Sequence, residues 1–256
     1  MAGAFDAQFG KSIANDSLCD RRYCISRILC CFKRAERILP CPESEAPKSV
    51  EVRLAFSDLL AEQVDFIRST VNGISETLRL DIHVLPDLVQ HSTHIIANTD
   101  PKGLSKRTYK YLAGILLKKP IISFMWYVEL FEASRGICAP DYDTLHAEVL
   151  LQQLTENNIV RGDFSYGYSD APAMAHKIVH AEPVLKGVGI QDVNSTLTQA
   201  ELMLVELAGG TVCKGDGDTS ANTVSILDIE QFYAMISSGH VLTLREKKIF
   251  RFELPQ

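Results

Sequence analysis

Residues 107–134, RTYKYLAGILLKKPIISFMWYVELFEAS, constrain the fold of this chain more than any other stretch. The pattern passes from an apolar helix to the short apolar strand PIISF, and then to a second helix with the only tryptophan, Trp126. A short strand that is apolar on both faces is typical of a parallel sheet covered by helices. The stretch therefore predicts an α/β fold.

The same alternation of strand and helix patterns begins at Val50 and returns further along the chain. In the first part, strands are predicted at 50–56, 80–86, 93–98 and 120–124, and helices at 58–72, 106–119 and 125–134. In the second part, strands are predicted at 184–193, 211–215 and 223–229, and helices at 196–210 and 229–239. Two copies of a unit of about 90 to 100 residues are the simplest explanation.

The predicted organisation has four parts. These are a Cys-rich, basic segment at 1–48, a first repeat at 49–140, a linker with a helix at 141–182, and a second repeat at 183–256. Within the linker, residues 160–176 are predicted to form a loop because they are rich in Gly, Ser, Asp and Pro. The C-terminal residues 239–256 are predicted to form a strand pair, which would make the ending of the second repeat degenerate.

Cysteine spacing and charge exclude several classes of protein. Five of the seven cysteines lie in residues 1–48, spaced C-x4-C and C-x5-C without histidine, which does not match a structural zinc site. We expect this segment to be weakly ordered or helical, without a bound metal. The net charge of −6 argues against a whole-chain preference for duplex DNA or acidic membranes. Without a secretory signal or a long apolar run, the chain is expected to be intracellular, with reduced thiols.

Several segments together resemble a BRCT repeat. They are STHIIANTD, the helix RTYKYLAGILLKKP, the strand IISF, and a helix that carries Trp126; the second part adds an apolar helix ending in Gly209 and Gly210 before TVC. The resemblance implies tandem BRCT repeats over about 50–256, packed head to tail, each a small parallel sheet flanked by helices. Within the family, the segments are most similar to the C-terminal repeats of the breast cancer type 1 susceptibility (BRCA/BARD-like) subfamily.

The resemblance implies a phosphoserine-binding site in the first repeat. Such proteins hold the phosphate with a hydroxyl near the end of the first strand, the adjacent backbone NH, and a lysine that corresponds to Lys110. Thr108 is placed to support the site, and Arg107 corresponds to an arginine that grips the peptide main chain three residues beyond the phosphoserine. The alternative is that Arg107 and Lys110 form the solvated face of an amphipathic helix.

The phosphate-binding hydroxyl is the weakest part of this resemblance. Leu54 and Ala55 stand where the family's Ser-Gly would align, and Ser57 is the nearest hydroxyl. Ser57 could contact the phosphate, or it could cap the helix that follows.

Further residues are implied to line a pocket for an aromatic side chain or to support the fold. Leu112 and Thr196 correspond to pocket residues, and routine packing is the alternative for both. Trp126, Gly209 and Gly210 are expected to be structural. His94 is expected to join a buried hydrogen-bond network.

The expected function is a phosphopeptide-binding scaffold of the nuclear DNA-damage response and DNA repair, as the resemblance implies. It would bind phosphorylated partner proteins, with a RING-domain partner in a ubiquitin ligase complex as a further expectation. The alternatives are a docking module that ignores phosphate, and a protein that binds DNA ends with help from basic residues in 1–48. No catalytic constellation is present in the sequence, and no cofactor is expected.

Overall fold

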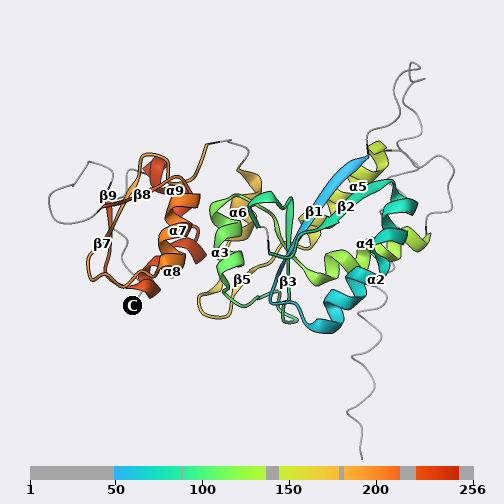
Figure 1. Cartoon of the computed structure of the whole chain (residues 1–256), viewed down its shortest axis with the longest axis horizontal. Helices are drawn as coiled ribbons and strands as arrows, with labels where there is room; N and C mark the ends of the chain where they lie inside the picture. Colours follow the sequence, from blue (N-terminus) through green and yellow to red (C-terminus); the bar gives the residue numbers. More distant parts are fainter. Residues whose placement is uncertain (1–48, 88, 137–143, 179–181, 214–222, 248–256) are drawn as a thin grey trace, which may run out of the picture. The chain divides into compact units, whose positions relative to one another are not determined.

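The computed structural model has an α/β fold built on two separate parallel sheets flanked by helices, which confirms the fold class (Figure 1). The chain from Ser49 onward forms one compact unit. The residues that the structure describes are 49–87, 89–136, 144–178, 182–213 and 223–247. The cysteines of residues 1–48 therefore lie outside the described residues.

The first sheet has four parallel strands in the order β2, β1, β3 and β4. Their bounds, in that order, are Leu80–Val84, Val50–Ser57, His94–Ala97 and Ile121–Ser123. β1 lies between two neighbours, and its second half is buried, including Leu54 and Ala55, which are both 0% exposed. The first half of β1 alternates between apolar and charged residues, as its sequence predicts, and the burial on both faces accounts for the apolar run from Leu54 to Phe56.

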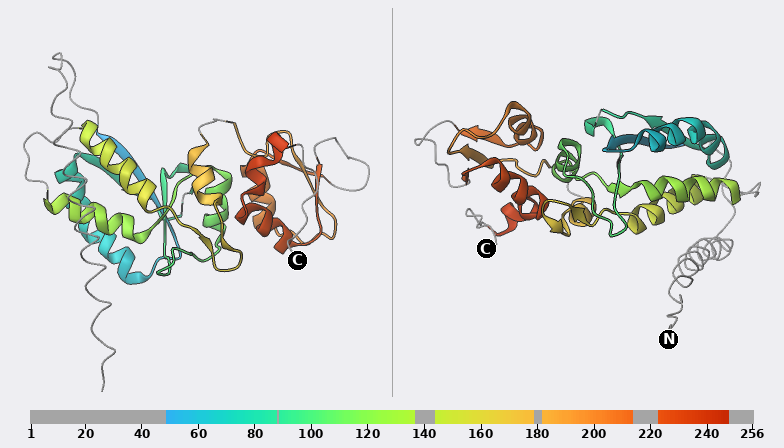
Figure 2. Two further views of the ribbon diagram at one scale, coloured as in Figure 1. Left: turned by 180° about the vertical axis from the view of Figure 1, so that it is seen from behind. Right: turned by 90° about the horizontal axis from the view of Figure 1, so that it is seen from below.

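Helices cover this sheet and connect its strands. The helices are α2 (Ala61–Leu78), the short 3₁₀ helix η1 (Val89–His91), α3 (Tyr109–Leu116), α4 (Phe124–Gly136) and α5 (Thr144–Asn157). The yellow-green helix α4 and the yellow helix α5 lie side by side in both views of Figure 2. None of the helices in the described parts of the chain is both long enough and apolar enough to cross a bilayer.

Trp126 of α4 is fully buried and links three elements. Its indole Nε1–H donates to Thr155 Oγ1 of α5 at 3.2 Å, and its ring stacks on His94 of β3 with 5.3 Å between the ring centroids. His94 Nε2 also lies 3.3 Å from Thr155 Oγ1, and His94 Nδ1 lies 2.9 Å from Thr93 Oγ1. The histidine and the tryptophan thus share one hydrogen-bond network.

The environment of His94 predicts a pH-dependent stability. Burial, helped by the charges of His176 and Lys119, lowers the pKa of His94 to about 4, against about 6.5 in an unfolded chain. The unfolded state therefore binds more protons between these values. This contribution to stability is fully present above pH 6.5 and is lost as the pH falls toward 4.

We expect the free energy of unfolding to fall by about 2 kcal/mol between pH 7 and pH 5 because of this group. Urea unfolding at pH 7 and at pH 5 measures this difference in the free energy of unfolding. His94→Gln should remove most of the pH dependence, whereas the same change at the exposed His91 should not. An equal slope in wild type and His94→Gln would contradict the assignment.

The second sheet has three parallel strands in the order β8, β7 and β9. The strands are β7 (Gly189–Asp192), β8 (Thr211–Cys213) and β9 (Thr223–Ile226), and the helices are α7 (Gln199–Leu207), α8 (Ile229–Ser237) and α9 (His240–Lys247). As in the first sheet, the first strand in the chain lies in the middle. Within the described residues this sheet has no fourth strand.

The C-terminal strand pair that the sequence suggests is wrong, because residues 240–247 form α9. Gly239 adopts a positive φ of 77° at the end of α8, so the chain turns there, and Val241 then packs into the core at 1% exposure. The strand-like pattern HVLTL is thus overridden by packing against the preceding helix.

The linker loop expected at 160–176 is also more regular than predicted. It contains a hairpin of β5 (Gly162–Asp163) and β6 (Gly167–Tyr168), followed by α6 (Ala171–Lys177). Asp163 Oδ1 accepts hydrogen bonds from the backbone N–H groups of Ser165 and Tyr166, both at 2.9 Å, and so fixes the turn. Strands of two residues are too short to produce a sequence pattern.

Candidate functional site

Two hydroxyl groups meet where β1 ends and α3 begins. Ser57 is the last residue of β1, and its Oγ lies 2.7 Å from Thr108 Oγ1. Thr108 is the N-cap of α3, where its Oγ1 accepts the backbone N–H of Tyr111 at 3.1 Å. The carboxyl end of a parallel strand and the N-terminus of a helix, with its positive dipole end, are both places where anions bind.

The hydroxyl at the end of β1 belongs to Ser57. Leu54 and Ala55 are interior strand residues with 0% exposure, and the strand continues to Ser57. Asp58 follows with a φ of 57°, in the left-handed region that favours glycine. Ser57 and Asp58 are therefore the pair at the end of β1, three residues after Leu54 and Ala55.

The alternative that Ser57 caps the next helix is wrong. The N-cap of α2 is Leu60, whose backbone N–H donates to Gln63 Oε1 at 2.9 Å. Ser57 is instead bonded to Thr108 and is 1% exposed. Its hydroxyl thus belongs to the junction of β1 and α3.

Lys110 lies in the first turn of α3, two residues after Thr108. Its Nζ donates to the carbonyl oxygen of Pro86 at 2.6 Å and to Asp87 Oδ1 at 2.8 Å. The hydrogen bond and the positive charge of Lys110 lower the pKa of Asp87. Lys106 forms a second ion pair, in which its Nζ lies 3.2 Å from Asp58 Oδ1. Each of these two lysines is therefore paired with a carboxylate in this structure.

Arg107, just before α3, is linked to α8. Its guanidinium donates to Glu230 Oε2 of α8 at 2.6 Å and lies over the ring of Tyr233, 4.9 Å from the centroid. The Arg107 side chain is 10% exposed and that of Lys110 is 28% exposed. Neither value fits the alternative of a freely solvated helix face.

The junction next to Arg107 is more polar than an aromatic pocket would be. Tyr233 Oη–H donates to Glu201 Oε1 of α7 at 2.5 Å. Burial acts to raise the pKa of Glu201, but hydrogen bonds from Thr198 and Tyr233 outweigh it, so the pKa is lower than usual. A buried carboxylate that stays ionised makes this part of the junction unsuitable for a purely apolar ligand group.

The two residues expected to line the aromatic pocket have separate roles here. Leu112 is 2% exposed and belongs to the apolar core, which includes residues of α3, α7 and α8. Thr196 lies in the loop before α7, where its backbone N–H donates to Asp192 Oδ1 at 3.0 Å. Leu112 thus acts as a packing residue of α3, and Thr196 as part of a side-chain-stabilised loop.

The two glycines expected to be structural lie at the end of α7. Gly209 has a φ of 79°, and a Cβ there would lie 2.5 Å from Pro183 Cβ. The backbone N–H of Gly210 donates to Val205 O at 2.9 Å, which closes the helix end.

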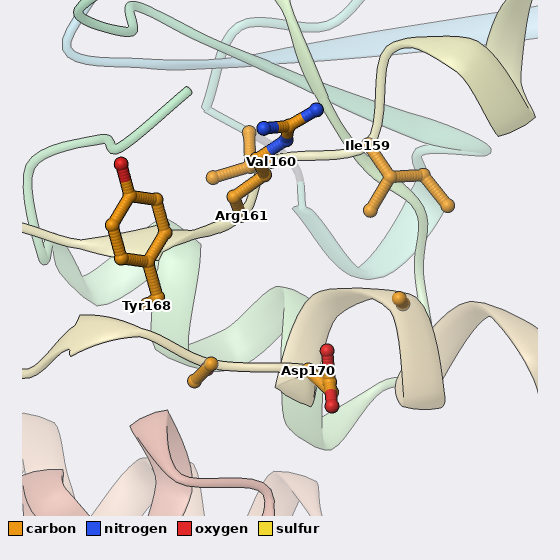
Figure 3. Close-up of a pocket in the computed structure, with 7 residues that line it drawn as sticks. Ile159, Val160, Arg161, Tyr168 and Asp170 are labelled. Atoms are coloured by element: carbon orange, nitrogen blue, oxygen red, sulfur yellow. The ribbon is translucent and has the colours of Figure 1, made fainter. Parts of the chain in front are cut away.

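A pocket of about 450 Å³ lies elsewhere, in the linker. It is lined by Ile159, Val160, Arg161, Tyr168, Ser169, Asp170 and Ala173. Arg161 comes from one segment, and Tyr168 and Asp170 come from the next (Figure 3). Because its lining has one cationic and one anionic side chain, it has no net preference for an anion. Among the described residues, no group of three or more potential metal ligands occurs.

Comparison with known proteins gives a likeness in fold. No protein-family model and no curated protein matches the chain. Among solved structures, the BRCT5-BRCT6 domains of S. pombe Brc1 are 13% identical with a TM-score of 0.45, and the match covers 75% of this chain and 95% of that one.

Two further solved structures have the same kind of similarity. The FHA-BRCT1-BRCT2 domains of S. pombe Nbs1 are 18% identical with a TM-score of 0.40, covering 77% of this chain and 61% of that one. Rad4 BRCT1,2 in complex with a Mdb1 phosphopeptide is 16% identical with a TM-score of 0.31, covering 79% and 97%. A specific similarity to the breast cancer type 1 susceptibility subfamily stays a prediction.

Proposed function

We propose that this chain is a tandem-BRCT scaffold that binds phosphoserine peptides at Ser57, Thr108 and Lys110. The observation that carries the proposal is the meeting of two hydroxyls, 2.7 Å apart, with a lysine in the first turn of the same helix. The nuclear DNA-damage response and DNA repair are the setting that the family resemblance implies.

The chemistry of the three side chains suits a phosphate. Thr108 Oγ1 accepts from the backbone of Tyr111, so its own proton can be donated to Ser57 Oγ. The Ser57 proton is then not used by Thr108, and donating it to a phosphate oxygen requires the ligand to uncover this hydroxyl, because Ser57 is 1% exposed. Lys110 supplies a charge-assisted hydrogen bond, and the N-terminal end of α3 adds a favourable dipole.

The binding of a peptide chain beyond the phosphoserine would use the junction of the repeats. Arg107 is held at that junction by Glu230 and Tyr233. Since Leu112 is covered and Glu201 is ionised, we expect no strong preference for phenylalanine three residues after the phosphoserine.

The test is a titration of the full chain with two peptides that differ only in phosphorylation of one serine. We expect the phosphorylated peptide to bind at least tenfold more tightly, and Lys110→Met to abolish the difference, because it removes the only charge-assisted donor assigned to the phosphate. Lys102→Met removes the same charge from an exposed turn and should leave the difference intact. Equal binding of both peptides to wild type would contradict the proposal.

A second candidate is protein docking without phosphate. One observation favours it: Lys110 and Lys106 already have carboxylate partners, at 2.8 and 3.2 Å. In that case Lys110→Met would leave partner binding unchanged.

A RING-domain partner in a ubiquitin ligase complex and DNA-end binding are secondary proposals that rest on the family resemblance alone. The basic residues considered for DNA lie in 1–48, outside the described residues. Binding to DNA ends that weakens steeply with salt concentration would support the DNA-binding proposal.

A further inference from the structure

We infer that the ligand is a phosphoserine segment with a lysine or arginine next to the phosphoserine, and that Asp87 binds this basic residue. The inference rests on the proposed function and names the class of peptide that the site takes. It follows from the ion pairs that the site already contains.

The position of Asp87 is fixed at the edge of the phosphate site. The carbonyl oxygen of Pro86 accepts two hydrogen bonds, one from the Lys110 ammonium at 2.6 Å and one from the backbone N–H of Phe56 at 3.3 Å. Phe56 directly precedes Ser57, so the residue before Asp87 is tied to the strand that ends in the candidate hydroxyl. Asp87 itself is 85% exposed, and so is open to a ligand.

A bound phosphate would change the partner of Asp87. It carries a charge of about −1.5 to −2, against −1 for a carboxylate, so Lys110 favours the phosphate. Asp87 would then lie next to a dianion without its cation, and the two would repel each other. A basic residue of the peptide beside the phosphoserine removes this repulsion by pairing with Asp87.

Asp58 supplies a second acceptor of the same kind. It directly follows Ser57, and its partner Lys106 is 64% exposed, so this pair is also open to exchange. Two carboxylates next to one phosphate site would disfavour acidic or neutral sequences around the phosphoserine. The net charge of −6 on the whole chain acts in the same direction.

The test is a double-mutant cycle between the protein and the peptide. The full chain, as wild type and Asp87→Asn, is titrated with phosphopeptides that have arginine or alanine on both sides of the phosphoserine. We expect wild type to prefer the arginine peptide about fivefold at low salt, and less at high salt, because the pair is exposed. In Asp87→Asn, the alanine peptide should bind about threefold more tightly, and the preference should fall below twofold.

Asp81→Asn is the matched control. Asp81 lies near the start of β2, paired in register with Glu51, whereas Asp87 follows the other end of that strand. Asp81→Asn removes the same charge from another exposed carboxylate, 52% exposed against 85% for Asp87, so it should keep the preference for arginine. A preference that is equal in wild type and Asp87→Asn would overturn the inference and leave phosphate binding intact. If wild type binds the unphosphorylated peptide as tightly as the phosphorylated one, the proposed function fails, and this inference fails with it.

Discussion

Trp126→Ala is expected to lower the free energy of unfolding by about 4 kcal/mol, as large-to-small changes of buried tryptophans do. The side chain is 0% exposed, so its loss leaves a cavity between α4, α5 and β3. It also removes the hydrogen-bond donor to Thr155 and the ring that stacks on His94. Urea unfolding followed by circular dichroism measures the change.

Trp126→Phe separates packing from hydrogen bonding. It keeps an aromatic ring but loses the Nε1–H donor to Thr155, so we expect a loss of about 2 kcal/mol. Equal losses for the two variants would mean that the hydrogen bond, rather than the filled volume, accounts for the role of Trp126. If Trp126→Ala lowers the free energy of unfolding by less than about 1 kcal/mol, the complete burial of the Trp126 side chain would be contradicted.

The alternation of strands and helices could be predicted from the sequence because most elements have either an apolar period or a short continuous apolar run. Residues 107–134 alone contain α3, β4 and α4 in the predicted order. The errors lie where packing decides the conformation. Residues 240–247 form a helix after the turn at Gly239, which follows the end of α8 at Ser237. The hairpin of β5 and β6 depends on Asp163.

The residues of the candidate phosphate site could be predicted from the sequence only in part. Lys110, Thr108 and Ser57 came from a short motif and its neighbourhood in the sequence. Asp87 and Glu230 could not be predicted, because they lie 23 and 123 residues from their partners Lys110 and Arg107. The backbone conformation of Asp58 at the end of β1 has only a weak signal in the sequence: aspartate is enriched among the non-glycine residues with positive φ, but such residues are uncommon overall.

The hairpin also connects the linker to the candidate phosphate site. The backbone N–H of Ser105 donates to Gly162 O at 3.1 Å, and the backbone N–H of Phe164 donates to Ser105 O at 3.0 Å. Ser105 lies three residues before Thr108. A distortion of β5 should therefore reach the start of α3 and the hydroxyl pair.

Gly162→Ala is expected to cause such a distortion. Gly162 has a φ of 138°, and a Cβ there would overlap the carbonyl oxygen of Gly167, which is backbone and cannot rotate away. We expect the free energy of unfolding to fall by about 3 kcal/mol, from overlap and backbone strain together. Because Ser105 would lose its partner strand, phosphopeptide binding should also weaken, by about tenfold. Thermal unfolding and a peptide titration measure the two effects.

Gly167→Ala in the same hairpin provides the comparison that isolates the overlap. Gly167 also has a positive φ, 98°, but a Cβ there meets nothing within 4 Å. Only backbone strain remains, so the loss should be about 1 kcal/mol, and peptide binding should be nearly unchanged. If both variants lose the same stability and affinity, strain rather than the contact with Gly167 explains the requirement for glycine. If Gly162→Ala lowers stability but leaves peptide affinity intact, the hairpin supports the fold without positioning the start of α3.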